Sequence, residues 1–386
     1  MTRSTTPDDR PDTTPLVVRF GAMGDMVLLS VLLRALARRH GRPVDLLSSG
    51  AWTPALLAHD PHVRELHLLA SRKRPYWLTP SQWSAVHWLR RHQGPVILCD
   101  ADDASARLLQ RAGVPRERLL RAWDHRPTGE VHWADWWVQI AQRDPPGLPG
   151  PRQPLGFSPP EQPSSATTLP DAQPAIHVPE TWRHEAKPWM AKLGLEGPTL
   201  VLMQPGNKKT HRRGKLATAY SDKHWDAGHW GQVARGVAQR LADAPEGAVI
   251  GVCGSTAESS VAEDVLQAAG PLPTGVRIVN LAREQLSLPR LAVLAERAHS
   301  MVTVDTGPAH LAAALDCPLV VLYGSAGWGN WKPRAPQATV HCLGSREPDA
   351  QARVDSLRPE AVLQAWLALP GRPAAHALDN PAAGVR

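Results

Sequence analysis

The stretch VTVDTGPAHLAAALDCPLVVLYG, residues 302–324, predicts a strand, a turn, a helix and a second strand in close succession. The apolar run before Asp305 is typical of a buried strand, and Pro308 suits the first position of a helix, where its missing N–H is not needed. PLVVLYG then returns as an apolar strand. Two strands joined through a helix pair in parallel with a right-handed crossover, so this stretch predicts an α/β sheet.

The same alternation runs through both halves of the chain. Strand-like and helical patterns follow one another in the N-terminal half, at residues 15–20, 26–41, 43–49, 95–100 and 104–113. The C-terminal half is more complete, with strand-like runs such as TLVLMQPG (199–206) and GAVIGVCG (247–254). Because parallel sheets bind ligands at the carboxyl ends of their strands, we predict two Rossmann-like parallel-sheet domains that face a central cleft.

Length and composition mark the divisions between the domains. A chain of 386 residues is too long for one compact core. Proline, serine and glycine dominate between Pro145 and Pro174, where neither a helix nor a central strand is sustainable. The predicted divisions are a disordered tail at 1–14, an N-terminal domain at 15–144, a linker at 145–180, a C-terminal domain at 181–370 and a flexible tail at 371–386.

The overall composition is globular and basic. No apolar run approaches the roughly 18–20 residues that span a bilayer. The opening segment MTRSTTPDDRPDTTP resembles neither a secretory signal nor a transit peptide, so we expect a cytoplasmic protein. A net charge of +7 and a pI near 9.5 favour a polyanionic partner, which leaves a phosphorylated substrate, an anionic membrane surface and nucleic acid open.

Cysteine and tryptophan carry no metal or cofactor motif. The cysteines lack a CxxC pair, so we expect buried free thiols at Cys99, Cys253, Cys317 and Cys342. Tryptophans gather in RKRPYW (72–77) and VHWADWWVQI (131–140). Tryptophan suits sugar faces and membrane interfaces, but it more often fills a core, and both interpretations stay open.

Two segments of the C-terminal half could bind phosphate. Backbone N–H groups at the start of the helix after Asp305, with the Thr306 hydroxyl, form a phosphate receptor, and Asp305 can accept hydrogen bonds from sugar hydroxyls. His310 could face the same site; the alternative is that Asp305 or Thr306 only caps the helix and His310 is an interior residue. Lys223 follows a glycine-containing basic loop and could neutralise a departing diphosphate, although this loop could also be merely solvated.

Five motifs, in this order, resemble the bacterial glycosyltransferase family 9, which includes the heptosyltransferases of lipopolysaccharide core synthesis. They are GAMGD near the N-terminus, DKHW, GSTAE, NLAREQLSLPRLAVLAERA and VDTGPAHLAAALDCPLVVLYG. The resemblance spans about residues 16 to 335 and rests on ordered motifs. It implies a GT-B architecture and an inverting transfer of heptose from an ADP-activated donor to a lipid-linked, phosphorylated saccharide, with no metal or other cofactor. It also implies a peripheral location at the cytoplasmic face of the inner membrane.

The resemblance also implies site residues. Asp25 of the MGD turn corresponds to the general base, and Gly21 and Gly24 shape this turn on the acceptor side. Taken alone, Asp25 would be a helix cap. For the donor, the resemblance implies a lysine on the phosphate or sugar, an acid on the nucleoside and a binding loop, which correspond to Lys223, Glu258, Asp305, Thr306, Gly307 and His310.

Some features depart from the family pattern or favour other classes. CDADD places Asp100, Asp102 and Asp103 where a DxD metal site is one alternative and a helix cap another. The loop at 207–221 is longer than the family pattern. A transferase for another nucleotide-sugar and a non-catalytic sugar-nucleotide-binding protein remain alternatives. Nucleic-acid binding rests only on charge, and a dehydrogenase is disfavoured because GAMGD lacks the GxGxxG spacing.

Overall fold

The computed structural model describes residues 13–72, 74–148, 171–207, 221–324, 328–345 and 353–372. Most of the predicted tails, most of the proline-rich linker and nearly all of the 207–221 loop lie outside these ranges. The chain divides into two compact units. Unit 1 comprises Met1–Ala22, Leu29–Gly129 and Asp135–Ala172, and unit 2 comprises Met23–Leu28, Glu130–Ala134 and Gln173–Arg386.

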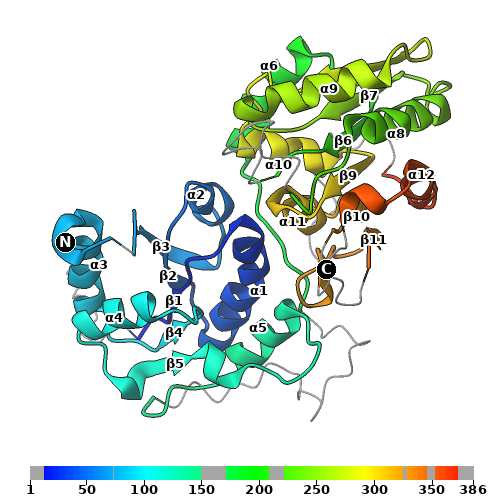
Figure 1. Ribbon diagram of the computed structural model, residues 1–386. Coiled ribbons are helices and arrows are strands. Elements are labelled where there is room, and N and C mark those ends of the chain that lie inside the picture. The colour runs from blue at the N-terminus through cyan, green and yellow to red at the C-terminus, as the bar shows by residue number, and fades with distance from the viewer. Residues whose placement is uncertain are drawn as a thin grey trace. The chain divides into compact units, whose positions relative to one another are not determined.

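Unit 1 is built on a five-stranded parallel sheet with the order β3-β2-β1-β4-β5 (Figure 1). Its strands are β1 (Leu16–Val18), β2 (Val44–Ser48), β3 (Val63–Leu68), β4 (Val96–Leu98) and β5 (Leu119–Arg121). The central strand β1 is fully buried, as its apolar sequence predicts. Leu16 pairs with Asp45 of β2 on one side and with Val96 of β4 on the other. The chain adds β2 and β3 on one side of β1 and then β4 and β5 on the other side, so the strand order reverses between β1 and β4.

The helices of unit 1 cover both faces of this sheet. They are α1 (Met23–His40), which begins in unit 2, α2 (Trp52–Leu57), α3 (Pro80–Arg91), α4 (Asp103–Arg111) and α5 (Trp133–Ala141). Helices α3 and α4 pack together and share one apolar core with β1 and β4. The end of α1 has the predicted form, because basic residues fill its last turn and Gly41 follows with a φ of 63°, which favours glycine.

Unit 2 is built on a six-stranded parallel sheet with the order β11-β10-β9-β6-β7-β8. Its strands are β6 (Thr199–Gln204), β7 (Ala248–Val252), β8 (Val276–Asn280), β9 (Ser300–Val304), β10 (Leu319–Leu322) and β11 (Val340–Leu343). Every recorded pairing is parallel. Strands β6 and β9 are neighbours although they are far apart in sequence, so their carboxyl ends form the topological switch point at which such sheets bind ligands.

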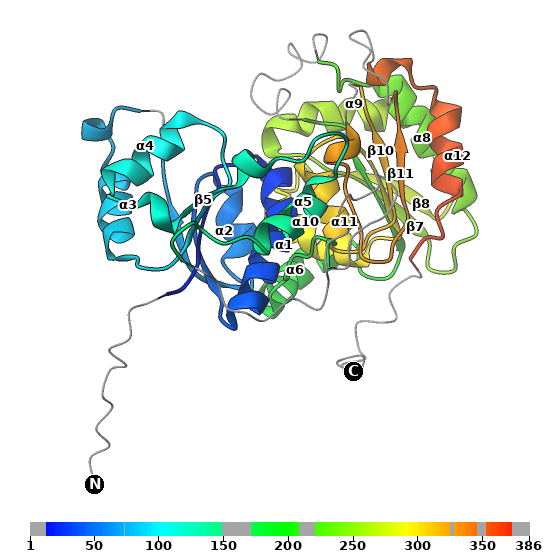
Figure 2. The same cartoon turned by 90° about the horizontal axis from the view of Figure 1, so that it is seen from below.

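The helices of unit 2 form a layer on each side of the sheet. They are α6 (Glu180–Lys192), α8 (Ala227–Arg240), α9 (Ser259–Ala269), α10 (Leu288–Arg297), α11 (Gly307–Ala314) and α12 (Pro359–Leu367). Helices α8, α9 and α12 pack together over one face, and α10 contacts α6 and α11 on the other (Figure 2). The predicted α/β fold of two parallel-sheet domains is confirmed.

The tryptophan clusters have different environments. Trp136, Trp137 and Trp230 are almost fully buried, which is the core placement that tryptophan favours. Trp77 of RKRPYW is 70% exposed. The cysteines are free, as expected, and three are buried, whereas Cys342 is only partly buried.

Candidate functional site

The loop that follows β9 lies at the switch point of unit 2 and brings two predicted residues together. The Lys223 ammonium donates to Oδ2 of Asp305 at 2.6 Å and to its backbone oxygen at 2.8 Å. The Lys223 side chain is 31% exposed and that of Asp305 is 11% exposed. An ammonium has three N–H donors, so Asp305 uses two and fixes the position of the charge.

The start of α11 differs from the capping alternative. Thr306 occupies the N-cap position, yet its side chain makes no capping hydrogen bond. Its hydroxyl donates to the backbone oxygen of Val304 at 3.2 Å. The carboxylate of Asp305 accepts from Lys223. The prediction that Asp305 or Thr306 only caps the helix is therefore not met, because neither side chain caps α11. Backbone N–H groups at this helix start are suited to an anion.

The MGD turn packs against this loop within unit 2. A Cβ atom placed on Gly24 would lie 2.6 Å from Cδ2 and 3.0 Å from Nε2 of His310. A Cβ atom on Gly307 would lie 2.6 Å from Cβ of Met23. Two glycines thus allow the backbones of the two motifs to approach closely. The imidazole ring of His310 leaves no space for a side chain at position 24, and the sequence did not indicate this contact.

Asp25 lies in the first turn of α1, which begins at Met23. It therefore lies inside the helix and does not occupy the cap position before it. Gly21 lies between β1 and α1. His310 is buried, and burial lowers its pKa, while the charges of Asp305 and Asp25 act in the opposite direction and Lys223 adds to the lowering. A neutral imidazole therefore lies near the carboxylates of Asp305 and Asp25 and the ammonium of Lys223.

Glu258 lies after β7 and has a local structural contact. Its Oε2 atom accepts from the backbone N–H of Ser255 at 2.9 Å and from the Ser255 hydroxyl at 2.8 Å. Ser255 and Glu258 form a capping box at the start of the short helix η5 (Thr256–Glu258), which precedes α9. The Glu258 side chain is buried, and its two hydrogen bonds with Ser255 fix its direction.

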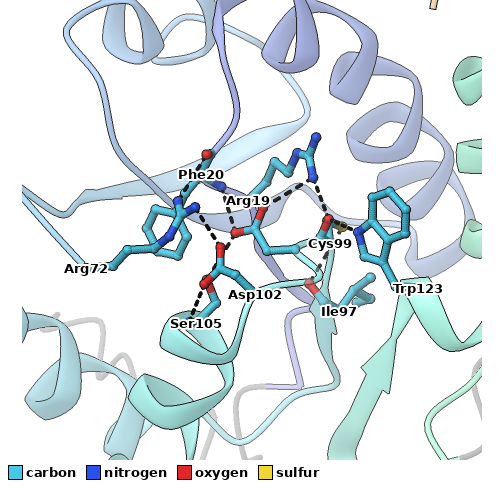
Figure 3. A network of polar contacts seen from close by, with 9 residues as sticks. Arg19, Phe20, Arg72, Ile97, Cys99, Asp102, Ser105 and Trp123 are labelled. Atoms are coloured by element: carbon cyan, nitrogen blue, oxygen red, sulfur yellow. Dashed lines mark hydrogen bonds and ion pairs between the residues drawn. The ribbon is translucent and has the colours of Figure 1, made fainter. Parts of the chain in front are cut away.

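Strands β1 and β4 of unit 1 end in a polar network (Figure 3). Asp100 is buried and accepts from Arg19 Nη1 at 3.2 Å and from the backbone N–H of Phe20 at 3.0 Å. Arg19 Nη1 also donates to the backbone oxygen of Cys99 at 2.7 Å, and Trp123 Nε1 donates to the same oxygen at 2.9 Å. Burial raises the pKa of Asp100, although Arg19 and Arg72 oppose this shift.

Asp102 caps α4, as one of the two interpretations of CDADD predicts. Its Oδ1 atom accepts from the backbone N–H of Ser105 at 3.0 Å, and its Oδ2 atom lies 2.6 Å from Arg72 Nη2 (Figure 3). Asp103 lies in the first turn of α4. Asp100 and Asp102 are thus engaged by arginines and backbone groups. Within the described ranges, no group of three or more histidine, cysteine or acidic side chains is arranged to hold a metal ion.

Residues 130–134 contribute to unit 2 through contacts that sequence reasoning missed. His132 Nδ1 accepts from the backbone N–H of Ala134 at 3.1 Å, so Nε2 carries the proton that it donates to the backbone oxygen of Lys332 at 2.8 Å. Burial, with Arg334 and other nearby basic groups, lowers the pKa of His132 to about 3. Trp133 packs on Trp331 with ring centroids 5.9 Å apart. The tryptophan-rich sequence was the only signal for this contact.

Several solved structures share the fold of this chain. A glycosyl transferase family 9 protein from Veillonella parvula matches with a TM-score of 0.66 and 15% identity, covering 92% of this chain and 96% of that one. An E. coli ADP-heptose lps heptosyltransferase II matches with a TM-score of 0.60 and 21% identity over 92% and 98% of the two chains. E. coli heptosyltransferase WaaC with ADP matches with a TM-score of 0.58 and 17% identity over 91% and 98%. The fold is the GT-B architecture.

A family model also matches part of the sequence. Residues 213–360 match the model of Glycosyltransferase family 9 (heptosyltransferase). This match confirms the predicted resemblance of the chain to that family. No curated protein sequence gives a match. Among the described helices, none combines the length and apolar character needed to cross a membrane.

Proposed function

We propose that this protein is an inverting, metal-independent glycosyltransferase. It transfers a heptose or a related sugar from an ADP-activated donor to a phosphorylated, lipid-linked saccharide in lipopolysaccharide core synthesis. The contact between the MGD turn and the loop after β9 carries this proposal, because it brings an acid close to a phosphate-binding helix start. Asp25 is the general base, and Gly21 and Gly24 shape its turn.

The chemistry assigns each residue a step. Asp25 takes the proton of the acceptor hydroxyl, and the oxygen attacks the anomeric carbon of the sugar on the face opposite the diphosphate. The bond between that carbon and the diphosphate oxygen breaks, and ADP leaves with the bonding electrons. Charge that develops on the leaving group is stabilised by Lys223 and by the backbone N–H of Gly307 at the start of α11. A fixed positive charge can thereby replace a metal ion.

The remaining donor residues orient the nucleotide-sugar. Asp305 holds Lys223 through two hydrogen bonds, which leaves the third N–H of the ammonium for a phosphate oxygen. Glu258 holds the nucleoside, with its direction fixed by the capping box. Thr306 and the neutral His310 complete the donor loop. Each hydrogen bond to a charged group of this kind contributes about 1.5–3 kcal/mol.

We propose the acceptor and the location on the resemblance to family 9, and the charge of the chain is compatible with both. A net charge of +7 suits an anionic, lipid-linked acceptor and a peripheral position at the cytoplasmic face of the inner membrane. We propose no nucleic-acid partner.

The test is transfer from ADP-heptose by the wild type, Asp25→Asn and a matched control, Asp103→Asn, which changes another first-turn acid. We expect Asp25→Asn alone to lose transfer. Nuclear magnetic resonance of the product should show inversion at the anomeric carbon, and a chelator should leave the rate unchanged. Full activity of Asp25→Asn would remove the assigned base.

The donor is tested separately by thermal stabilisation with ADP-, UDP-, GDP- and CMP-sugars. A ligand at a hundred times its dissociation constant stabilises by about 2.7 kcal/mol. Stabilisation only by a non-ADP sugar would favour a transferase for another glycan. Stabilisation by ADP-heptose without transfer to any acceptor would favour the non-catalytic alternative.

A further inference from the structure

An exposed apolar surface lies on unit 1, around the short helix η1 (Tyr76–Leu78). Five large apolar side chains are markedly exposed among the described residues, and four of them belong to this region. They form what we call the Trp77 surface: Leu68 (41% exposed), Trp77 (70%), Leu78 (56%) and Trp83 (46%). Apolar exposure concentrated in one segment is typical of an interaction surface.

Hydrogen bonds hold this surface in place. Trp83 Nε1 donates to the backbone oxygen of Tyr76 at 2.7 Å, which ties α3 to η1. The buried Gln82 donates to the backbone oxygens of Ser71 at 2.8 Å and Arg74 at 3.0 Å. The guanidinium of Arg111 lies 4.8 Å from the centroid of the Tyr76 ring. Trp77 and Leu78 are therefore presented to solvent by an ordered backbone.

The segment of sequence that carries this surface has basic residues and no acidic ones. No acidic residue occurs between Glu65 and Asp100, whereas the same segment contains Arg72, Lys73, Arg74, Arg90 and Arg91. On α3, the exposed residues Trp83, His87 and Arg90 follow the helical spacing of one stripe. Tryptophan and arginine thus share one face of this helix.

We propose that the Trp77 surface docks on an anionic phospholipid bilayer. Tryptophan and leucine enter the boundary between headgroups and acyl chains, where the amphipathic indole ring is favoured. Arginine side chains around them bind lipid phosphates, and each basic residue adds to the attraction of the anionic surface. The combination of exposed tryptophans with a segment free of acids favours a bilayer over a neutral saccharide or an apolar protein groove.

The docking surface continues into the carboxyl edge of the unit 1 sheet. Arg72 lies at the start of the basic segment, donates to the backbone oxygen of Phe20 at 3.1 Å and pairs with Asp102. A bilayer bound at Trp77 would therefore be close to the ends of β1 and β4. That this edge receives a lipid-linked acceptor rests on the proposed function, but bilayer binding itself does not.

The experiment measures binding of the full chain to phosphatidylglycerol-rich and pure phosphatidylcholine vesicles by co-sedimentation. The apolar variant is Trp77→Ser with Leu78→Ser, and its control is Leu367→Ser, an exposed leucine of α12 (42% exposed). The charge variant is Arg90→Gln with Arg91→Gln, and its control is Arg240→Gln with Arg358→Gln, two exposed arginines of unit 2. Thermal midpoints and stabilisation by ADP-heptose report folding and donor binding.

We expect binding to the anionic vesicles to weaken by about tenfold or more in the apolar variant and by about thirtyfold in the charge variant. The controls should bind as the wild type does. Unchanged binding in the apolar variant, or equal binding of the wild type to both vesicle types, would overturn the proposal. The outcome is independent of catalysis, because a protein without transferase activity would still bind vesicles.

Discussion

Gly24 lies directly against the ring of His310, so Gly24→Ala tests whether the two motifs pack as the structure describes. The added Cβ would lie 2.6 Å from Cδ2 of a buried ring. This is well below the contact distance of about 3.5–4.0 Å between carbon atoms. Overpacking of this kind costs about 1–3 kcal/mol, partly offset by a gain of up to about 1 kcal/mol from replacing a helical glycine.

The assay is a double-mutant cycle on the thermal midpoint, with Gly24→Ala, His310→Ala and both changes together. Removing the imidazole opens the space that the new methyl group needs, so we expect Gly24→Ala to be less harmful, or stabilising, in the His310→Ala background. Contacting residues show coupling energies of about 0.5–3 kcal/mol. For a domain of about 150–250 residues, 1 kcal/mol corresponds to about 2–4 °C. Additive shifts in the midpoint would refute the packing of Gly24 on His310.

The remaining predictions concern the donor loop, a buried histidine and a helix cap. Lys223→Ala should weaken ADP-sugar binding by about tenfold or more, measured by calorimetry, while the exposed control Lys192→Ala should not. Because the pKa of His132 falls from 6.5 to about 3 on folding, its contribution to stability is complete above pH 6.5 and is lost as the pH falls below it, by up to about 1.4 kcal/mol per pH unit. His132→Gln should flatten the dependence of the thermal midpoint on pH in this range, and an unchanged slope would contradict the buried neutral state. Asp102→Ala should lower stability by about 1 kcal/mol through loss of the α4 cap, whereas Asp103→Ala should be milder; equal losses in thermal denaturation would contradict the capping role.

The sequence predicted those elements whose apolar pattern is strong. The fully buried β1 is apolar throughout and the long α1 is mainly apolar, and their predicted limits were close to those observed. Strand β3 was missed because VRELHL is half exposed and carries charges, and β5 was missed because LLR is only partly buried and ends in an exposed arginine. Patterns of local apolarity therefore identify central strands more readily than edge strands.

The site could be predicted only as separate motifs. The position of Asp305 at the end of β9 followed from the strand and helix pattern, whereas its pairing with Lys223 joins residues 82 positions apart. The contact of Gly24 with His310 and the engagement of Asp100 by Arg19 also depend on tertiary structure. No local pattern encodes such distances, so the sequence predicted the residue types and the fold supplied their neighbours.

The most direct test of the central claim compares the rate of heptose transfer from ADP-heptose by the wild type and by Asp25→Asn. Loss of a general base slows a reaction by about 10²–10⁴-fold. We expect Asp25→Asn to lose transfer by a factor of this size while ADP-heptose stabilises it as much as it stabilises the wild type. Transfer by Asp25→Asn at the wild-type rate would contradict it.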